Sequence, residues 1–331
     1  MSFPFNVYLP AFAGAFIVSL AALPCWRVIC RRIGLVDDPG HRKIHETPMP
    51  LAGGLAVLTG MVLPLLLGVA MVQWNIPRLP GAHGLLEHGL DVRRTELIAI
   101  VLGAVGIVVT GWLDDQYELK PLVKFTGQLL VAALIAVSGI RITLFVHSTL
   151  FSYAVTILWM LTVINAFNFM DNMNGLCAGL GAIGSWFFAL IAIMDGQYLV
   201  ALLALLACGA LLGFLPYNFP KASAFLGDTG SHLVGYLLAV MAILPHFYTA
   251  QHPRRWSVLI PLLILAVPLG DLAYVVMLRW KLGKPFYHGD TNHLSHRLVK
   301  RGLTKQKTVL LIWLAAAMLG GAAAALMLRP G

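Results

Sequence analysis

The sequence has few charged side chains. Lysine, arginine, aspartate and glutamate together make up 11% of its 331 residues, whereas hydrophobic residues make up 59%. A soluble domain carries about 25% charged residues, so this chain has too few to cover a surface that faces water throughout. The composition excludes a soluble protein and predicts an integral membrane protein. No internal repeat, linker or low-complexity tract divides it, which favours a single polytopic domain over residues 1–331.

Cysteine is also scarce. The chain has four cysteines, all in or beside apolar runs, and no CxxC pair. This pattern favours neither a disulfide framework nor a zinc site. Acidic residues are fewer than basic ones, 14 against 23, but the basic residues lie in short segments between apolar runs. We interpret them as determinants of membrane topology and expect no nucleic-acid partner.

Long apolar runs account for most of the chain. At roughly 20 residues per crossing, the hydrophobic content suffices for about ten membrane-spanning helices, which predicts an all-α protein of the inner or plasma membrane. Lysine and arginine concentrate in the loops that lie in the cytoplasm if the N-terminus is outside, so both termini are expected to face outward. No lysine or arginine precedes Arg27, which favours a retained first helix over a cleaved signal. The expected spans are residues 7–29, 51–74, 96–113, 121–139, 151–170, 176–194, 198–216, 231–248, 257–279 and 308–328.

Polar residues gather in clusters that follow the odd-numbered helices of this topology. All of them are therefore expected at the cytoplasmic face, where segments that are distant in sequence can form one site. The outward loops contain nothing comparable. The clusters are Asp37-Asp38, Asp114-Asp115, residues 165–174, residues 218–231 and residues 288–296.

Two adjacent carboxylates, Asp114 and Asp115, end the third expected helix. The C-terminus of a helix is the negative end of its dipole, so this pair needs a cation nearby. Lys120 and Lys124 follow at the start of the next helix, and a bound metal would serve as well. The alternative is a solvated turn that is satisfied by salt bridges.

Asparagine is concentrated at the membrane edge between Asn165 and Asn174. Asn165, Asn168 and Asp171 are spaced by three residues and share one face of a continued helix. These amides offer donors and acceptors to a polar ligand, and burying them unpaired would cost several kcal/mol each. A network that only holds helices together is the alternative.

The segment before the eighth expected helix carries the sequence Gly-Asp-Thr-Gly-Ser, residues 227–231. Its glycines permit close backbone approach, and Asp228 is a hard oxygen ligand of the kind that Mg²⁺ prefers. Gly230 and Ser231 lie where a helix N-terminus could present amides to a phosphate. Alone, the segment could also be an ordinary capped turn.

Two further loops are rich in basic and imidazole side chains. His293, His296 and Arg297 lie in the last inward loop, and Lys43 and His45 lie in the first; all are candidate contacts for phosphate groups. No third ligand follows the two histidines at zinc spacing. Both loops could instead serve topology alone or contact anionic lipid.

Two other features have competing interpretations. Gly179, Gly181 and Gly184 match a GxGxxG motif, but they lie inside an apolar helix with no preceding strand, which predicts helix packing. Asp271 lies within the ninth expected helix, close to Pro268. An intramembrane carboxylate is typically functional, but this one could equally be a structural hydrogen-bonding partner at a kink.

Taken together, these segments resemble the polyprenyl-phosphate N-acetylhexosamine-1-phosphate transferases, the membrane family that includes WecA, TagO and MraY. The matching stretches recur in family order across residues 34–298. The form Asp-Asn-Met-Asn-Gly is closer to the WecA and TagO branch than to MraY. The stretches are HRKIHETPMPLAGG, GWLDDQYELKPLVK, NAFNFMDNMNGLCAG, PYNFPKASAFLGDTGS and DTNHLSHRL.

The resemblance implies an enzyme that moves a sugar 1-phosphate, such as GlcNAc 1-phosphate, from a UDP-sugar to undecaprenyl or another polyprenyl phosphate and releases UMP. It implies Mg²⁺ as the cofactor, with Mn²⁺ as a substitute, and Asp228 as the metal ligand. Phe225 resembles the ring that stacks on uracil. With the residues discussed above, the expected catalytic residues are Asp114, Asp115, Asp171 and His296, and the expected substrate-binding residues are Lys43, His45, Lys120, Lys124, Asn165, Asn168, Asn174, Asn218, Phe225, His293 and Arg297.

One position departs from the family form. The histidine motif usually reads His-x-His-His, and Ser295 stands here in place of the middle histidine. Serine cannot carry charge or act as a base near neutral pH, so the role of that ring is open in this chain. If the loop keeps the family geometry, we expect Ser295→His to be tolerated.

The expected chemistry brings two anionic substrates together. Phosphoryl transfer requires their charge to be neutralised, which Mg²⁺ with Lys124, His296 and Arg297 would do. The second pKa of the acceptor phosphate is about 6, so it is largely ionised and needs no strong base. We expect direct attack by the lipid phosphate, with Asp114 orienting it or removing a residual proton. Asp115 would support the metal or Lys120.

Other routes and functions stay open at this point. The rival mechanism passes through an aspartyl phosphate on Asp114, Asp115 or Asp171. MraY-type transfer of phospho-MurNAc-pentapeptide is one alternative function, and a transporter with deep ionisable residues is another. The family makes a homodimer plausible. The hypothesis as a whole requires Asp228 to face the other three carboxylates at one membrane face.

Overall fold

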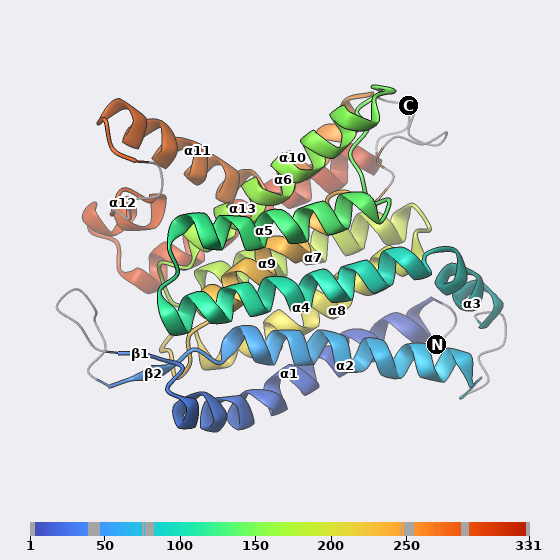
Figure 1. The fold of residues 1–331 in the computed structure, drawn as a ribbon, viewed down its shortest axis with the longest axis horizontal. Coiled ribbons are helices and arrows are strands. Elements are labelled where there is room, and N and C mark those ends of the chain that lie inside the picture. Colours follow the sequence, from blue (N-terminus) through green and yellow to red (C-terminus); the bar gives the residue numbers. More distant parts are fainter. Residues whose placement is uncertain are drawn as a thin grey trace.

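A computed structural model describes residues 4–38, 47–74, 76, 83–245, 247, 255–285 and 291–328 of the chain (Figure 1). Nearly all regular structure is helical, and one pair of two-residue strands joins antiparallel. The elements are α1 (Phe5–Ile33), β1 (Val36–Asp37), β2 (Met49–Pro50), α2 (Gly53–Gln73), α3 (His83–Val92), α4 (Arg94–Tyr117), α5 (Pro121–Val137), α6 (Thr149–Met170), α7 (Leu176–Met194), α8 (Tyr198–Phe214), α9 (Gly227–Met241), α10 (Ile260–Ile264), α11 (Ala266–Lys281), α12 (Leu294–Lys300) and α13 (Lys305–Leu328), with short 3₁₀ helices at Leu215–Tyr217 and Arg255–Leu259.

The apolar runs form helices because only a helix satisfies its own backbone hydrogen bonds in lipid. Among the described residues, seven helices are long and apolar enough to cross a membrane: α1, α2, α4, α6, α7, α8 and α13. A broken pair, residues 256–264 and α11, is bent by 78° and counts as an eighth if it is one span. The protein is therefore a multi-span, helical membrane protein, as expected. Ten crossings and the outward orientation of the termini stay predictions, since α5 and α9 are shorter.

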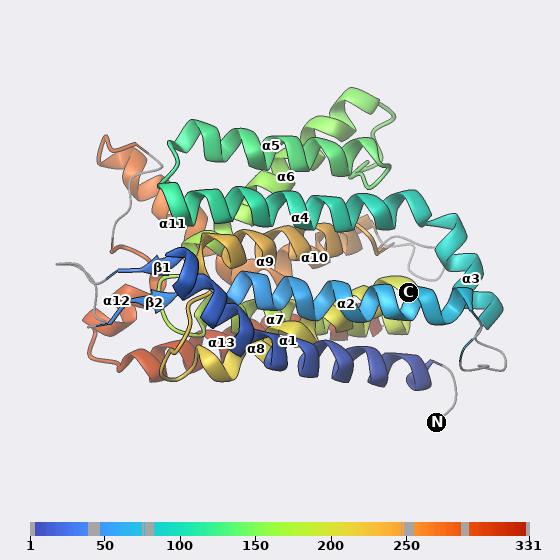
Figure 2. The same ribbon diagram turned by 60° about the horizontal axis from the view of Figure 1, so that its bottom comes forward.

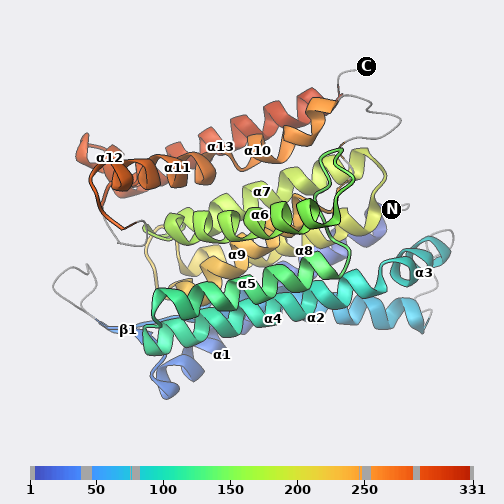
Figure 3. The same ribbon diagram turned by 45° about the horizontal axis from the view of Figure 1, so that its top comes forward.

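The interior of the bundle is formed by α7, α8 and α9 (Figures 2 and 3). Most of α7 and α8 is buried, and every residue of α9 from Thr229 to Met241 is buried. α9 packs against α4, α6, α2 and α7, and α8 packs against α1 and α7. α9 is thus surrounded by the helices whose ends carry the polar clusters.

The GxGxxG match is a helix-packing motif, as expected. A Cβ on Gly179 would lie 2.1 Å from the Trp313 ring of α13, and a Cβ on Gly184 would lie 2.4 Å from Leu238 of α9. The small residues therefore let α7 approach its neighbours closely, and no nucleotide fits between them.

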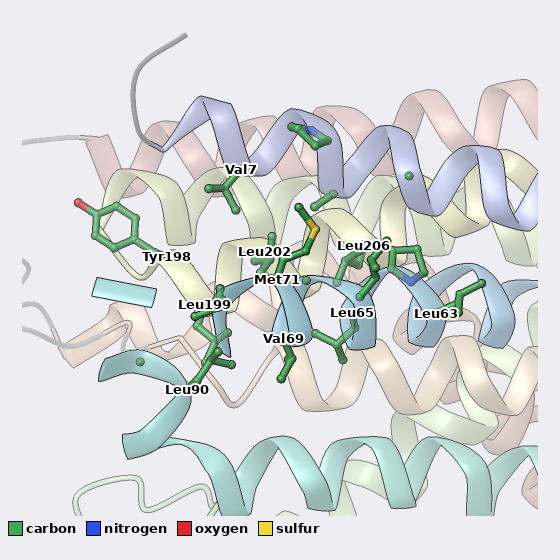
Figure 4. Close-up of a pocket in the computed structure, with 18 of the residues that line it drawn as sticks. Val7, Leu63, Leu65, Val69, Met71, Leu90, Tyr198, Leu199, Leu202 and Leu206 are labelled. Atoms are coloured by element: carbon green, nitrogen blue, oxygen red, sulfur yellow. The ribbon is translucent and has the colours of Figure 1, made fainter. Parts of the chain in front are cut away.

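The two ends of the bundle differ in chemistry. α12, the strand pair and the turn between α4 and α5 lie together at one end, whereas α1 begins and α13 ends at the other (Figures 1 and 3). A cavity of about 580 Å³ lies near that second end, between α1, α2 and α8. Its lining is almost entirely apolar and includes Val7, Leu63 and Leu202 (Figure 4). The polar residues of its described lining are few, and the one cation among them, Arg93, is paired with Glu96, so the polar clusters lie at the other end of the bundle.

Candidate active site

A lysine and two carboxylates meet at the polar end of the bundle. Nζ of Lys124, on α5, lies 2.6 Å from Oδ2 of Asp114 on α4 and 2.8 Å from Oδ2 of Asp228 on α9. Asn168, on α6, donates through Nδ2 to Oδ1 of Asp228 and to Oγ of Ser231. Four helices therefore contribute to one cluster, and Asp228 is its centre.

Asp115 caps the N-terminus of α9. Its Oδ1 accepts a hydrogen bond from the Asp228 backbone N–H at 2.8 Å, and its Oδ2 accepts from the N–H and the hydroxyl of Thr229 at 2.9 and 2.6 Å. The first backbone N–H groups of a helix have no partner within the helix and carry its positive dipole, so a carboxylate there is doubly favourable. Both oxygens of Asp115 are thus engaged in holding the helix that carries Asp228.

Glycines allow this close assembly. A Cβ on Gly111 of α4 would lie 2.6 Å from the backbone oxygen of Asp228, and a Cβ on Gly54 of α2 would lie 2.5 Å from the backbone nitrogen of Gly230. Gly227 has φ +71°, which an L side chain rarely adopts, and a Cβ there would meet Oδ2 of Asp115 at 2.7 Å. These glycines let α2, α4 and α9 converge on the start of α9.

Asp171 lies just after the C-terminus of α6 and is partly buried. Burial, followed by the nearby carboxylates of Asp228 and Asp115, raises the pKa of Asp171 from its ordinary 3.8 to about 8. Without a bound cation, the folded protein therefore favours the neutral carboxyl near pH 7.

This shift predicts a pH dependence of stability. The folded-state pKa lies above the unfolded value, so the stabilisation from neutral Asp171 is fully present below about pH 4 and is lost as the pH rises through about 8. We expect the Tm of the divalent-free protein in detergent to fall over this range, and Asp171→Asn to flatten the fall. Tryptophan fluorescence melts across the range measure both, and identical pH profiles for the two proteins would contradict the assignment.

A second polar layer lies one turn deeper. Nδ2 of Asn165 donates to Oε1 of Gln128 on α5 at 2.8 Å and to the Leu161 carbonyl at 2.8 Å. Nε2 of Gln128 lies 3.3 Å from Nε2 of buried His232 on α9. Both amide hydrogens of Asn165 are therefore used inside the bundle. This residue helps to hold the helices together, which was the alternative to ligand binding.

The loop before α9 is tied to two other loops. Asn218 is buried; its Oδ1 accepts from Gly175 N–H at 2.6 Å and its Nδ2 donates to the Ala224 carbonyl at 3.0 Å. Phe225 donates its backbone N–H to the Pro50 carbonyl at 3.0 Å. Asn218 therefore connects the loop before α9 to the turn at Gly175, and the Phe225 backbone connects it to β2. Phe225 is partly buried. Asn174 is also partly buried and belongs to the same turn as Gly175.

The segment with His293 and α12, called the histidine loop below, is hydrogen-bonded to the asparagine-rich turn between α6 and α7. Oγ of Ser295 donates to Oδ1 of Asn172 at 2.6 Å, and Nδ1 of His293 lies 2.7 Å from Oδ2 of Asp271 on α11. The Arg297 guanidinium lies 4.2 Å from the centre of the Tyr274 ring. Burial, followed by the charges of His293, Lys300 and Lys305, lowers the pKa of His296 below its ordinary 6.5. This shift favours the neutral ring of His296.

Comparison with known proteins identifies the family. A probable undecaprenyl-phosphate N-acetylglucosaminyl 1-phosphate transferase of Bacillus subtilis is 35% identical over 312 residues, covering 91% of this chain and 80% of that protein. The chain belongs to glycosyl transferase family 4. The model of that family matches residues 97–246. A decaprenyl-phosphate N-acetylglucosaminephosphotransferase of Mycobacterium tuberculosis H37Rv is 30% identical over 331 residues, covering 92% of this chain and 79% of that protein. An undecaprenyl-phosphate alpha-N-acetylglucosaminyl 1-phosphate transferase of Escherichia coli K12 is 27% identical over 310 residues, covering 88% and 77% respectively.

The part that glycosyl transferase family 4 matches contains the central cluster but not the histidine loop. Asp228 contacts Lys124 and Asn168 through its side chain and Asp115 through its backbone N–H. Asp114 joins the cluster through Lys124. Asp228 therefore lies close to Asp114 and Asp115, and its charge acts on Asp171 as well, so the four carboxylates lie together as the hypothesis required. Lys120 is exposed at the N-cap of α5. Lys43 and His45 lie outside the described residues, and the roles of all these residues in substrate binding or catalysis stay predictions.

Several residues of this family 4 site were not identified from the sequence. Gln128 and Thr229 each bond to a residue of the expected set, and Ser231, expected only to offer its backbone amide, accepts from Asn168 through its hydroxyl. Gln128 follows Lys124 by four residues in an otherwise apolar helix, a spacing that could have indicated it. The sequence alone does not decide whether Asp271 has a functional or a structural role.

The burial of Ser295 argues against a histidine at this position. Ser295 is completely buried, and an imidazole would overpack the site at a cost of about 1–3 kcal/mol. We expect Ser295→His to lower the Tm in detergent by about 2 °C or more, and more than Ser295→Ala, which loses only the bond to Asn172. An unchanged Tm for Ser295→His would show that the loop can open.

Proposed function

We propose that this protein transfers N-acetylglucosamine 1-phosphate, or that of a related N-acetylhexosamine, from a UDP-sugar to polyprenyl phosphate, releasing UMP. The contact of Lys124 with both Asp114 and Asp228 carries the proposal, because it joins the family's polar segments into one site at one end of a membrane bundle. The names of the relatives, which act on undecaprenyl or decaprenyl phosphate, support the same reaction.

The negative charge around Asp228 supports the proposal that a divalent cation binds there. Asp114 and Asp228 share Lys124, whereas Asp115 is held by the N-terminus of α9, so the described residues bring three carboxylates and one lysine together and this end of α9 needs further positive charge to receive a diphosphate. Among the described residues no three His, Cys, Asp or Glu side chains form a ready metal cage. Mg²⁺ is usually held by one or two carboxylates together with substrate phosphates, and Asp228 with Asp114 fits that donor set. When bound there, Mg²⁺ or Mn²⁺ would supply charge neutralisation to the diphosphate.

The geometry favours direct attack by the lipid phosphate. Asp115 has both oxygens engaged by α9, Asp114 is paired with Lys124, and Asp171 favours its neutral form, so each candidate nucleophile of the two-step route is restrained. The acceptor phosphate is already largely ionised at neutral pH. Lys124, once released from one carboxylate by substrate, can hold a phosphate oxygen, while Asp114 orients the acceptor.

The position at a bundle end explains why the enzyme is a membrane protein. The acceptor tail stays in hydrocarbon while its phosphate meets a water-soluble nucleotide. We propose that this end faces the cytoplasm of the inner or plasma membrane, as the basic loops predict. A homodimer is compatible with this arrangement.

UMP release tests the function directly. Purified protein in detergent with UDP-GlcNAc, undecaprenyl phosphate and Mg²⁺ is expected to release UMP, and to form a lipid diphosphate sugar in equal amount. Omitting the lipid or chelating the metal should stop the release. Release only with UDP-MurNAc-pentapeptide would show MraY-type chemistry, and no release from any UDP-sugar would favour a transporter.

A further inference from the structure

A buried carboxylate–histidine pair lies outside the central cluster. Oδ2 of Asp271 is 2.7 Å from Nδ1 of His293, and the two side chains are 1% and 8% exposed. Because a carboxylate only accepts, Nδ1 of His293 carries the hydrogen. The other oxygen, Oδ1, accepts the backbone N–H of Leu294, the first residue of α12, at 2.6 Å. One side chain of α11 therefore fixes both the ring and the start of the helix that follows it.

The His293 ring is also packed against an aromatic side chain. The Phe169 ring packs edge-on against it at 5.5 Å between centroids, and the guanidinium of buried Arg279 lies 5.0 Å from the Phe169 centroid. Asp271 and Arg279 are two turns apart on α11, so they share one face. α11 thus supports the histidine loop, and Figure 3 shows α12 beside it.

We propose that Asp271 is a positioning residue that fixes His293 as the Nδ1–H tautomer and presents its Nε2 to a phosphate group of the substrates. The inference rests on the proposed function for its substrate. A ring of this tautomer offers the lone pair of Nε2 to the hydrogen of a monoprotonated phosphate; when that proton passes to Nε2, the new N–H donates to the same phosphate oxygen while Asp271 balances the charge. At metal sites, removing the carboxylate that orients a ligating histidine typically costs 10- to 100-fold in affinity or activity, and we expect a loss of the same order here.

Asp271→Asn makes a sharp test because it keeps the shape of the side chain and replaces one accepting oxygen by an NH₂ group that donates. An amide has one oxygen and one NH₂, and the Leu294 N–H can only donate, so the oxygen must stay with Leu294. The NH₂ then faces Nδ1 of His293, which must lose its hydrogen. The substitution is expected to reverse the tautomer of His293 while preserving shape and the cap of α12.

The measurement is ¹⁵N NMR of the histidine rings in detergent, with His293 assigned by its loss in His293→Gln. We expect a protonated-type Nδ1 and an unprotonated-type Nε2 in the wild-type protein, and the opposite pattern in Asp271→Asn. An unprotonated Nδ1 in the wild-type protein would overturn the proposal without any variant. This readout needs no turnover, so it separates failure of the proposal from failure of the proposed function.

A double-mutant cycle supplies the kinetic arm. Asp271→Asn is expected to lower kcat/KM for UMP release by about tenfold or more, and to add nothing in a His293→Gln background. Multiplying losses would show that Asp271 acts elsewhere and would overturn the role. Met277→Leu, on the exposed face of α11, is the matched control and should match wild type.

Discussion

Asp228→Ala is expected to lower the rate of UMP release by on the order of a thousandfold while the protein stays folded. Asp228 accepts from Lys124 and Asn168 and is the carboxylate on which the cluster converges. Its loss leaves Lys124 bound to Asp114 alone and removes the main proposed metal ligand. The comparison of kcat at saturating UDP-GlcNAc and polyprenyl phosphate, with Tm measured in parallel, gives the result.

Two controls keep this prediction specific. Asp228→Asn preserves volume and should be nearly as inactive, because an amide oxygen is a poor substitute for a carboxylate beside a cation. Glu96→Gln breaks an ion pair with Arg93 at the opposite end of α4 and should retain activity. Mg²⁺-dependent turnover by Asp228→Ala close to the wild-type rate would remove Asp228 as the metal ligand.

The sequence predicted the helices well because lipid imposes length and apolarity on them. Each of the ten apolar runs contains a helix or, for 257–279, a broken pair; α9 ends at Met241, short of the expected 248. The break at Leu265 lies between Pro261 and Pro268, which the sequence displays, but the 78° bend depends on packing that it does not. α9 begins at Gly227 rather than near 231, which places Asp228 in its first turn. α3 and α12 were not expected as helices.

The sequence could predict which polar segments meet at the candidate site, but not which side chains pair within it. Adjacent clusters at one membrane face indicated which residues meet. Partners could not be read from the chain, because Asp115 caps residues more than a hundred positions away and Asp271 binds a residue beyond a loop. Asn165 and Asn218 illustrate the limit: amide-rich sequence indicates hydrogen bonding, but whether the partner is a ligand or the backbone depends on the fold.

Asp115→Asn is expected to destabilise the protein and to lower kcat by about a hundredfold or more. An amide cannot accept on both sides, so its NH₂ must face the N–H of Asp228 or of Thr229. A buried donor left unpaired costs about 1–3 kcal/mol. The start of α9 then shifts, and a displacement of about 1 Å of a reacting group can cost a hundredfold in rate. Thermal melts and kcat measured on the same preparation test both parts.

Thr229→Val provides a graded comparison, since it removes only the hydroxyl bond to Asp115 and keeps both backbone bonds. Its losses in Tm and kcat should be smaller than those of Asp115→Asn. If Asp115 were instead the nucleophile of a two-step route, the wild-type protein would take up a covalent phosphoryl label from the UDP-sugar without lipid, and Asp115→Asn would not. Because three donors already occupy its two oxygens, we expect no such label, and the loss of activity should follow the loss of the cap.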